Sequence, residues 1–276
     1  MNTKRRSIAE SYKKCDALLV QAVSGEQGKT NFKVDSNLDS VVTETRADIF
    51  VGEEFWTSVA VSPMDLEDFV YGFAFSAGVI EVASDIISVH IEDNDSRLRI
   101  IISLREDIDV KTALNKANLQ QQIPVSQPVS GHMDLSDCDD VKISPDAIFD
   151  ISEKLLPMQS LHLETGASHA AAFASPKGDV LLLREDVGRH SAVEKLVGAL
   201  LRGNLNTSDG FVYLSSRCAL ELVRKLSAVG VKVVATVSAP TSAVLDFASE
   251  SGITLCAYAR PGRFTIYANP GRIDVD

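Results

Sequence analysis

Residues 184–196 read REDVGRHSAVEKL, in which a polar junction around Gly188 follows an apolar run at 180–183 and precedes a run with helical spacing. Two more junctions, SSR at 215–217 and SAPTS at 238–242, also stand between a strand-like and a helix-like stretch, and TGASH at 165–169 has a similar composition. In open α/β sheets, ligands bind at the carboxyl ends of strands, where helix amino termini favour anions such as phosphate. The junctions therefore predict an anion-binding cleft.

The sequence around these junctions, from 143 to 276, predicts one α/β domain. Apolar residues recur at helical spacing in some stretches and form short continuous runs in others. Helices are expected at 144–156, 190–201, 218–229 and 242–249, and strands at 161–164, 170–174, 180–183, 211–214, 231–237, 253–257 and 264–267. Alternating strands and helices imply a mainly parallel sheet with helices packed on it.

Residues 38–107 predict a second, small α+β domain in front of the first. Strand-like stretches at 41–50 and 55–61 suggest a hairpin, and two further strands are expected at 86–92 and 98–104. Between these pairs, Ser62 is a candidate cap for a helix that Pro63 opens and Gly78 ends.

Two segments show no clear pattern of helix or strand. Residues 1–37 are polar with weak periodicity, and we interpret them as a leader with a partly ordered or disordered tip. Residues 108–142 combine a glutamine run, prolines and a cluster of acids, which predicts a long exposed acidic linker at the domain boundary.

The charge of the chain is unevenly distributed. Its 27 Lys and Arg against 38 Asp and Glu give a net charge of −11; residues 150–276 hold 13 of each, so the excess (14 against 25) lies in 1–149. An acidic front half argues against nonspecific binding of nucleic acid, which needs basic patches. No run approaches the roughly 18 apolar residues of a membrane helix, and no apolar segment follows the basic start. These features predict a cytoplasmic protein without a membrane partner.

The four cysteines are Cys15, Cys138, Cys218 and Cys256, and no Cys-x-x-Cys pair is present. Their spacing predicts neither a disulfide framework nor a zinc site. Cys218 and Cys256 lie in apolar segments and are expected to be buried. A zinc deaminase is excluded because its His-x-Glu and Pro-Cys-x-x-Cys signature is absent. The sequence also shows no set of catalytic residues that would indicate a nucleotide hydrolase.

Each polar junction also has a purely structural interpretation. Arg189 and His190 begin a helix, where a cation is unfavourable unless an anion is bound, but a turn with internally satisfied ion pairs gives the same pattern. The serines and threonine at 238–242 can cap a helix as well as contact phosphate. Arg260 and Arg263, on either side of Pro261-Gly262, could belong to a solvated turn, and a lone histidine such as His169 is more often structural than catalytic.

Five stretches together resemble one known family. REDVGRHSAVEKL, SSRCALELVRK, VSAPTSAV, ITLCAYARPGRFTIY and, near the front, MDLEDFVYGFAFSAGVI occur in order within residues 40 to 272. They are similar to the formate dehydrogenase accessory sulfurtransferase family (FdhD). The resemblance implies a back domain with a cytidine-deaminase-like, three-layer α/β fold and no zinc, in a protein that forms homodimers.

The resemblance also implies a function. Such a protein would bind the molybdenum bis(guanine dinucleotide) cofactor and carry sulfur to it from a cysteine desulfurase, for the maturation of formate dehydrogenase. The positions that the resemblance and the junctions assign to the cofactor are His169, Arg184, Gly188, Arg189, His190, Ser215, Ser216, Arg217, Ser238, Thr241, Tyr258, Ala259, Arg260, Pro261, Gly262 and Arg263.

The chain departs from the family at the loop between the domains. Members carry a Cys-Gly-x-Cys-Gly element there, whereas residues 129–140 read VSGHMDLSDCDD, with Cys138 as the only thiol. Sulfur transfer needs a thiolate, and the acids beside Cys138 are expected to raise its pKa. Cys138 is therefore a candidate sulfur carrier. The alternative is a non-catalytic cofactor-binding scaffold with an incidental thiol in a solvated acidic loop.

Overall fold

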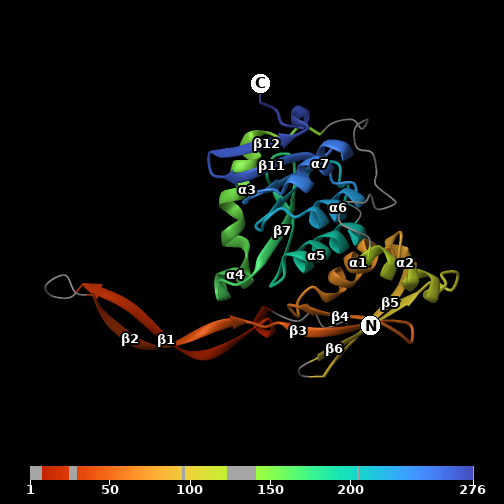
Figure 1. The fold of residues 1–276 in the computed structure, drawn as a ribbon, viewed down its shortest axis with the longest axis horizontal. Helices are drawn as coiled ribbons and strands as arrows, with labels where there is room; N and C mark the ends of the chain where they lie inside the picture. Colours follow the sequence, from red (N-terminus) through yellow and green to blue (C-terminus); the bar gives the residue numbers. More distant parts are fainter. Residues whose placement is uncertain (1–7, 25–29, 95–96, 123–140, 204, 276) are drawn as a thin grey trace.

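The computed structural model describes residues 8–24, 30–94, 97–122, 141–203 and 205–275. A long two-stranded ribbon projects from a body that holds two further sheets (Figure 1). We call residues 45–122 the front unit and residues 141–275 the back unit. Cys138 and the rest of the 123–140 segment lie outside the described residues.

The front unit is a four-stranded sheet with two helices packed on it. Its strands are β3 (Thr45–Val51), β4 (Glu54–Val61), β5 (Ile86–Asp93) and β6 (Arg97–Leu104), in the order β4-β3-β6-β5. The predicted hairpin is confirmed as β3 and β4, which pair antiparallel, and β3 and β6 run parallel. Helices α1 (Leu66–Ser76) and α2 (Val110–Gln122) share an apolar core with the sheet, and the short η3 (Ala83–Asp85) precedes β5.

The prediction of a loop over residues 108–142 was wrong for 110–122, which form α2. Ala113, Leu114 and Ala117 recur at helical spacing and are buried against the front sheet. The Asp109 carboxylate accepts a hydrogen bond from the backbone N–H of Thr112 at 2.8 Å at the helix start. Lysine, leucine, alanine and glutamine are good helix formers, so polar composition alone did not exclude a helix.

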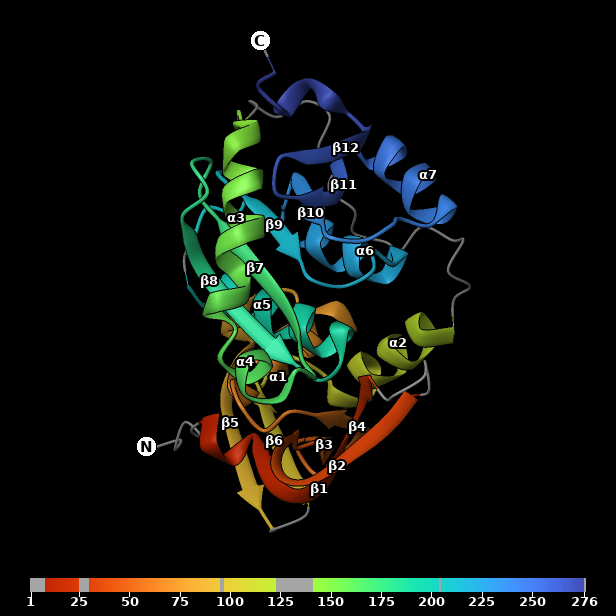
Figure 2. The ribbon, with the colours of Figure 1, turned by 90° about the vertical axis from the view of Figure 1, so that its left-hand side faces the viewer.

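The back unit has three layers, with a six-stranded sheet in the middle (Figure 2). Helix α3 covers one face, and α5, α6 and α7 cover the other. Its elements are α3 (Pro145–Met158), α4 (Ser160–Thr165), β7 (His169–Ala174), β8 (Val180–Asp186), α5 (Arg189–Arg202), β9 (Phe211–Leu214), α6 (Leu220–Ala228), β10 (Val233–Thr236), α7 (Ser242–Ser251), β11 (Thr254–Arg260), β12 (Arg263–Ala268) and η4 (Pro270–Arg272).

Two predictions for the back unit were wrong. The sheet, in the order β12-β11-β10-β9-β7-β8, is mixed rather than mainly parallel, because only β9–β10 and β10–β11 pair parallel. β7–β8 and β11–β12 are joined by short turns, which force antiparallel pairing. Residues 161–164 belong to α4 instead of a strand, since the Glu185 carboxylate accepts hydrogen bonds from the N–H groups of Leu161 and His162 at the helix start.

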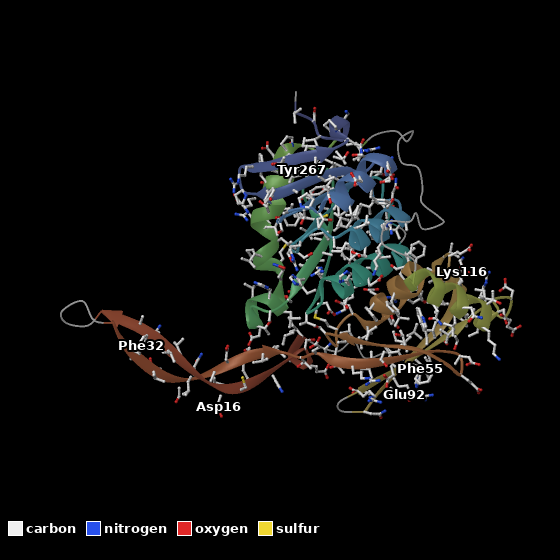
Figure 3. The ribbon with its side chains drawn as sticks, viewed as in Figure 1. Asp16, Phe32, Phe55, Glu92, Lys116 and Tyr267 are labelled. Atoms are coloured by element: carbon white, nitrogen blue, oxygen red, sulfur yellow. The ribbon has the colours of Figure 1, made fainter. Side chains whose placement is uncertain are left out.

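The ribbon is formed by β1 (Tyr12–Ser24) and β2 (Thr30–Val42), which pair antiparallel over their full length, with η1 (Ile8–Glu10) before them. The polar leader expected over 1–37 was therefore wrong for the described strands. Single apolar residues alternate with polar ones along much of β2, and the short apolar run at 17–20 in β1 stands between polar residues, so that the composition suggested a leader. In Figure 3, Phe32 stands on the ribbon far from the body.

The two units meet where α1 crosses α5. At this crossing Gly72 and Gly198 lie so close to the opposite helix that an added Cβ would meet the backbone oxygens of Glu194 and Asp68, respectively, at 1.8 Å. Only glycine permits this approach. The front unit is thereby held against the helix that begins at Arg189.

Candidate anion-binding site

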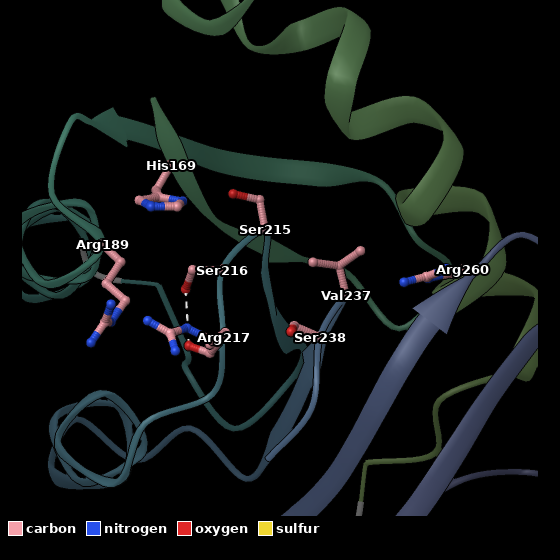
Figure 4. Close-up of a pocket in the computed structure, with 8 residues that line it drawn as sticks. All are labelled: His169, Arg189, Ser215, Ser216, Arg217, Val237, Ser238 and Arg260. Carbon is pink, nitrogen blue, oxygen red and sulfur yellow. Dashed lines mark hydrogen bonds between the residues drawn. The ribbon is translucent and has the colours of Figure 1, made fainter. Parts of the chain in front are cut away.

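An open pocket of about 360 Å³ lies at one edge of the back sheet (Figure 4). It is formed where β9, β10 and β11 end, where α5 begins and where β7 begins. The lining residues are His169, Arg189, Ser215, Ser216, Arg217, Val237, Ser238 and Arg260. The sequence predicted all of them except Val237, whose only signal was its place beside Ser238 after a strand.

His169 joins the pocket because of strand direction. β7 runs antiparallel to β9, so the start of β7 lies at the same edge as the end of β9. The register is closed by two hydrogen bonds: the Ala170 N–H donates to Ser215 Oγ at 2.7 Å, and the Ser215 N–H donates to the Ala170 carbonyl at 3.0 Å. Ser215 and His169 are thus held side by side by the backbone.

The pocket is cationic. Arg189 and Arg217 lie toward one end and Arg260 toward the other (Figure 4). Over the part of the chain that the structure describes, these three guanidinium groups form no ion pair, and the buried Nε of Arg189 has no hydrogen-bond partner. A buried polar atom without a partner calls for a ligand atom to satisfy it.

The same charges also act on the pKa of the His169 imidazole. Burial lowers the pKa of its imidazole from the usual value of 6.5, and the positive charges of Arg189, His162 and Arg217 lower the pKa further. The ring is therefore neutral near pH 7. Three guanidinium groups, a neutral imidazole and three serine side chains suit an anion with several oxygens, such as a phosphate ester.

Arg184, Gly188 and His190 do not line the pocket. The Arg184 guanidinium pairs with the Asp68 carboxylate of α1 at 2.7 Å. Gly188 has φ −97°, outside the left-handed region, and an added Cβ would make ordinary contacts at 3.5 Å. His190 is half-buried, and burial followed by the charges of Lys225 and Arg189 lowers its pKa.

Of the residues in the predicted turn at 258–263, Arg260 lines the pocket and the others do not. Tyr258 adopts a left-handed conformation with φ 52° and its N–H donates to the Ser238 carbonyl at 3.2 Å. The strand pairing is irregular between Ala257 and Arg260, and bulges of this kind re-aim side chains. Arg260, just beyond it, lines the pocket.

The other predicted residues of this region do not line the pocket. Ala259 is buried, and its carbonyl accepts a hydrogen bond from the Tyr213 hydroxyl at 2.8 Å. Gly262 has φ 74° in the turn to β12, where Pro261 and Arg263 are exposed. Thr241 occupies the cap position of α7, but its side chain makes no capping hydrogen bond.

Asp186, an acid beside the first junction, takes part in the contact between the two units. The Asp186 carboxylate forms an ion pair with Lys195 at 2.7 Å and accepts a hydrogen bond from the Ser62 N–H at 2.9 Å. Lys195 also donates to the carbonyls of Ser62 and Glu185 at 3.0 Å each. Ser62 was predicted to cap α1; instead it connects the front unit to this buried network.

Among the described residues, no three or more His, Cys, Asp and Glu side chains gather in a way that could hold a metal ion. No helix in the described ranges is long and apolar enough to cross a membrane.

Fold and pocket together define a mixed α/β protein with a cationic pocket at the edge of its back sheet. The chain belongs to the FdhD/NarQ family, whose sequence model matches residues 42–274. It is 33% identical over 239 residues to the sulfur carrier protein FdhD of Xanthomonas euvesicatoria pv. vesicatoria, covering 82% of this chain and 83% of the relative. Identity to the protein of the same name from Cupriavidus necator is 34% over 226 residues, covering 77% and 76%.

A solved structure is also similar to this one. The crystal structure of a formate dehydrogenase accessory protein from Desulfotalea psychrophila superposes with a TM-score of 0.71 at 26% sequence identity. The match covers 94% of this chain and 99% of that one.

Proposed function

We propose that this protein serves the maturation of formate dehydrogenase by binding the molybdenum bis(guanine dinucleotide) cofactor and carrying sulfur to it from a cysteine desulfurase. The observation that carries the proposal is the cluster of Arg189, Arg217 and Arg260 in one pocket without a carboxylate partner among the described residues. Membership of the FdhD/NarQ family supports it. The protein would act in the cytoplasm as a homodimer, and its three-layer back unit would be cytidine-deaminase-like.

The pocket suits one end of this cargo. A volume of about 360 Å³ is at the small end of the range for small-molecule sites, about 300–1,000 Å³, so it fits a single nucleotide rather than the whole cofactor. Arg189, Arg217 and Ser216 would hold phosphate oxygens, and Arg260 would contact the other end of the nucleotide. The cofactor itself supplies the molybdenum chemistry when bound.

The burial of the cysteines limits which of them could carry sulfur. Burial raises the pKa of the Cys218 and Cys256 thiols to about 12, so neither is a thiolate at neutral pH. Of the four cysteines, Cys15 and Cys138 remain, and the resemblance favours Cys138. In the proposed step, the Cys138 thiolate attacks the outer sulfur of the donor's persulfide. A new S–S bond forms as the donor's S–S bond breaks, and the donor leaves as a thiolate.

Sulfur transfer is tested with a desulfurase, cysteine and intact-protein mass spectrometry. The proposal expects a gain of one sulfur atom that Cys138→Ala abolishes and Cys15→Ser does not. No gain on the wild type would favour the alternative, a cofactor-binding scaffold without transfer chemistry. The matching functional test is rescue of formate dehydrogenase activity in a bacterium that lacks its own family member.

Nucleotide binding is tested by calorimetry with guanosine diphosphate. Arg260 lines the pocket, whereas Arg263, three residues along the same turn, is exposed outside it. Arg260→Ala should weaken binding by roughly tenfold to a hundredfold, the worth of a charge-assisted hydrogen bond, and Arg263→Ala should leave it within about twofold. Absence of binding by the wild type, or an equal effect of both variants, would overturn the proposed site.

A further inference from the structure

The last residues of β8 make contacts on two different sides of the strand. Successive side chains of a strand alternate between its two faces. Arg184 and Asp186 contact Asp68 and Ser62 of the front unit. Glu185 lies between them and points the other way, to α4. The first polar junction of the sequence thus serves two contacts, and only one of them is with the front unit.

The Glu185 carboxylate is buried and held by neutral donors. It is 4% exposed and accepts hydrogen bonds from the backbone N–H groups of Leu161 and His162 at 2.9 Å each and from Ser168 Oγ at 2.7 Å. Burial of a carboxylate is costly, and such hydrogen bonds offset the cost. Each of them also fixes its donor, so one side chain ties the start of α4 to the residue that precedes His169.

Residues 165–168, which we call the entry loop, lead from α4 into β7. Gly166 ends α4 in the left-handed conformation with φ 66°. Thr165 Oγ1 donates to the Leu161 carbonyl at 2.7 Å and accepts a hydrogen bond from the Ala167 N–H at 3.2 Å. The loop is therefore folded back on α4, and its position depends on where that helix is held.

Ser168, at the end of the entry loop, is fixed by two contacts. Its hydroxyl donates to Glu185, and its carbonyl oxygen lies 3.1 Å from His162 Nδ1. A carbonyl can only accept a hydrogen bond, so Nδ1 carries the proton. On the other side of His169, the backbone of Ala170 is hydrogen-bonded to the residue that follows β9. The chain is thus held immediately before and after the imidazole that lines the pocket.

We propose that Glu185 is a positioning residue for the cationic pocket: through Ser168 and the entry loop it aims the His169 imidazole at a bound anion. The inference rests on the proposed function in taking this pocket as the binding site, but it does not depend on which anion is bound. Glu185 itself does not line the pocket. It therefore acts on the ligand only through the residues that it holds.

A histidine in this place depends on such support more than the arginines do. Burial and the neighbouring cations keep the His169 ring neutral, and a neutral imidazole has one N–H to donate, whereas a guanidinium has five. A hydrogen bond weakens steeply when its angle is poor. The contribution of the ring to anion binding therefore depends on the direction of a single bond, which the backbone at the start of β7 sets.

Helix α4 has a second carboxylate anchor, which provides a matched control. Glu164 accepts hydrogen bonds from Lys14 Nζ and Ser40 Oγ of the ribbon at 2.7 Å each. Its side chain is 36% exposed, and none of these three residues lines the pocket. Loss of this anchor releases α4 from the ribbon but leaves the hydrogen bonds of Glu185 in place.

The first test measures the affinity of the full chain for inorganic sulfate by NMR, through the backbone amides of residues 215–217 and the imidazole of His169. Ser168→Ala removes one hydrogen bond of Glu185 and leaves the start of α4 intact. It should raise the dissociation constant of sulfate about threefold to tenfold, the worth of one hydrogen bond, and reduce the shift that sulfate causes in the His169 resonances. Glu185→Gln should have at least the same effect, whereas Glu164→Gln should stay within about twofold.

A double-mutant cycle separates positioning from a general effect on the fold. Ser168→Ala is repeated in a His169→Gln background, with unfolding of every variant followed by circular dichroism. If Glu185 acts through His169, Ser168→Ala should change the dissociation constant of sulfate by less than about twofold in that background. This comparison stands even if Glu185→Gln does not fold.

Four results would overturn the inference: wild-type affinity for Ser168→Ala, an equal loss from Ser168→Ala in both backgrounds, an equal loss from Glu164→Gln, or no response of the wild-type pocket to sulfate. A wild type that binds sulfate but not guanosine diphosphate would contradict the cofactor site and not the role of Glu185. The two failures can therefore be told apart.

Discussion

The chemistry of the pocket is set by single residues whose charges are left unbalanced. Arg189, Arg217 and Arg260 have no carboxylate partner within the described chain, in contrast to Arg184, which was predicted for the same site but pairs with Asp68. The sequence could not separate these cases because both kinds of arginine follow strand ends. What distinguishes them is the proximity of α1, which brings Asp68 to Arg184 from far along the chain.

The protonation of His169 provides a test at this scale. Burial and the neighbouring cations lower its pKa below 6.5 in the free protein. A bound anion offsets those cations and should raise the pKa, so binding takes up a proton and affinity should increase as pH falls through the window below about 6.5. The measurement is an NMR titration of the imidazole with and without sulfate, which does not itself titrate there.

The control for this titration is His169→Gln, which should remove the proton uptake that accompanies binding. A His169 that titrates at or above 6.5 in the free protein would contradict the prediction. So would a pKa that sulfate leaves unchanged while sulfate demonstrably binds.

Among the elements, the closest contact is the crossing of α1 and α5. Gly72→Ala and Gly198→Ala would each place a Cβ 1.8 Å from a backbone oxygen of the other helix. Each should lower the free energy of unfolding by about 1–3 kcal/mol or more, as overpacked cores do. Gly188→Ala is the matched control, because its Cβ would make only ordinary contacts at 3.5 Å, and should stay within about 0.5 kcal/mol.

Urea unfolding followed by circular dichroism measures these three variants under identical conditions. If Gly72→Ala and Gly198→Ala both kept the wild-type free energy of unfolding, the helices would be able to move apart at little cost. A large loss for Gly188→Ala would show that this glycine is needed for a reason other than contact at the crossing.

For the whole molecule, the contact between the units includes a fully buried ion pair of the back unit, Asp186 with Lys195, both of which hydrogen-bond to the backbone of Ser62 in the front unit. Burial lowers the pKa of Lys195, and the adjacent Asp186 carboxylate opposes that shift. Lys195→Met would leave Asp186 buried without its partner and should lower the free energy of unfolding by about 3–5 kcal/mol. Lys195→Met/Asp186→Asn should recover part of this loss, since no unpaired charge remains.

The comparison variant is Lys154→Met, which removes an exposed lysine paired with Asp150 on the surface of α3. Exposed pairs contribute little, so chemical denaturation should give the wild-type midpoint. Equal effects of Lys195→Met and Lys154→Met would mean that the buried pair stabilises the fold no more than an exposed one.

Much of the architecture could be predicted from local pattern. The helix that Arg189 begins and the strand Phe211–Leu214 follow from helical spacing and from a short apolar run, because these signals are local. The ribbon and α2 were not predicted because their apolar residues stand among many polar ones, and because the segments that they pair with or pack against are not specified by local spacing. The mixed sheet escaped it because strand direction is a property of neighbours in space.

The sequence by itself determined the family, the strand–helix junctions and nearly all of the pocket's side chains, since each depends on residue type and short-range spacing. Only the tertiary structure decided which junction residues line the pocket. Because β7 runs antiparallel to β9, His169 at the start of β7 lies beside Ser215, which follows β9, and lines the same pocket as Arg260, the last residue of β11. The tertiary structure also placed Arg184, Asp186 and Ser62 in the contact between the units, where partners distant in sequence pair with the buried charges. Local sequence does not specify such partners.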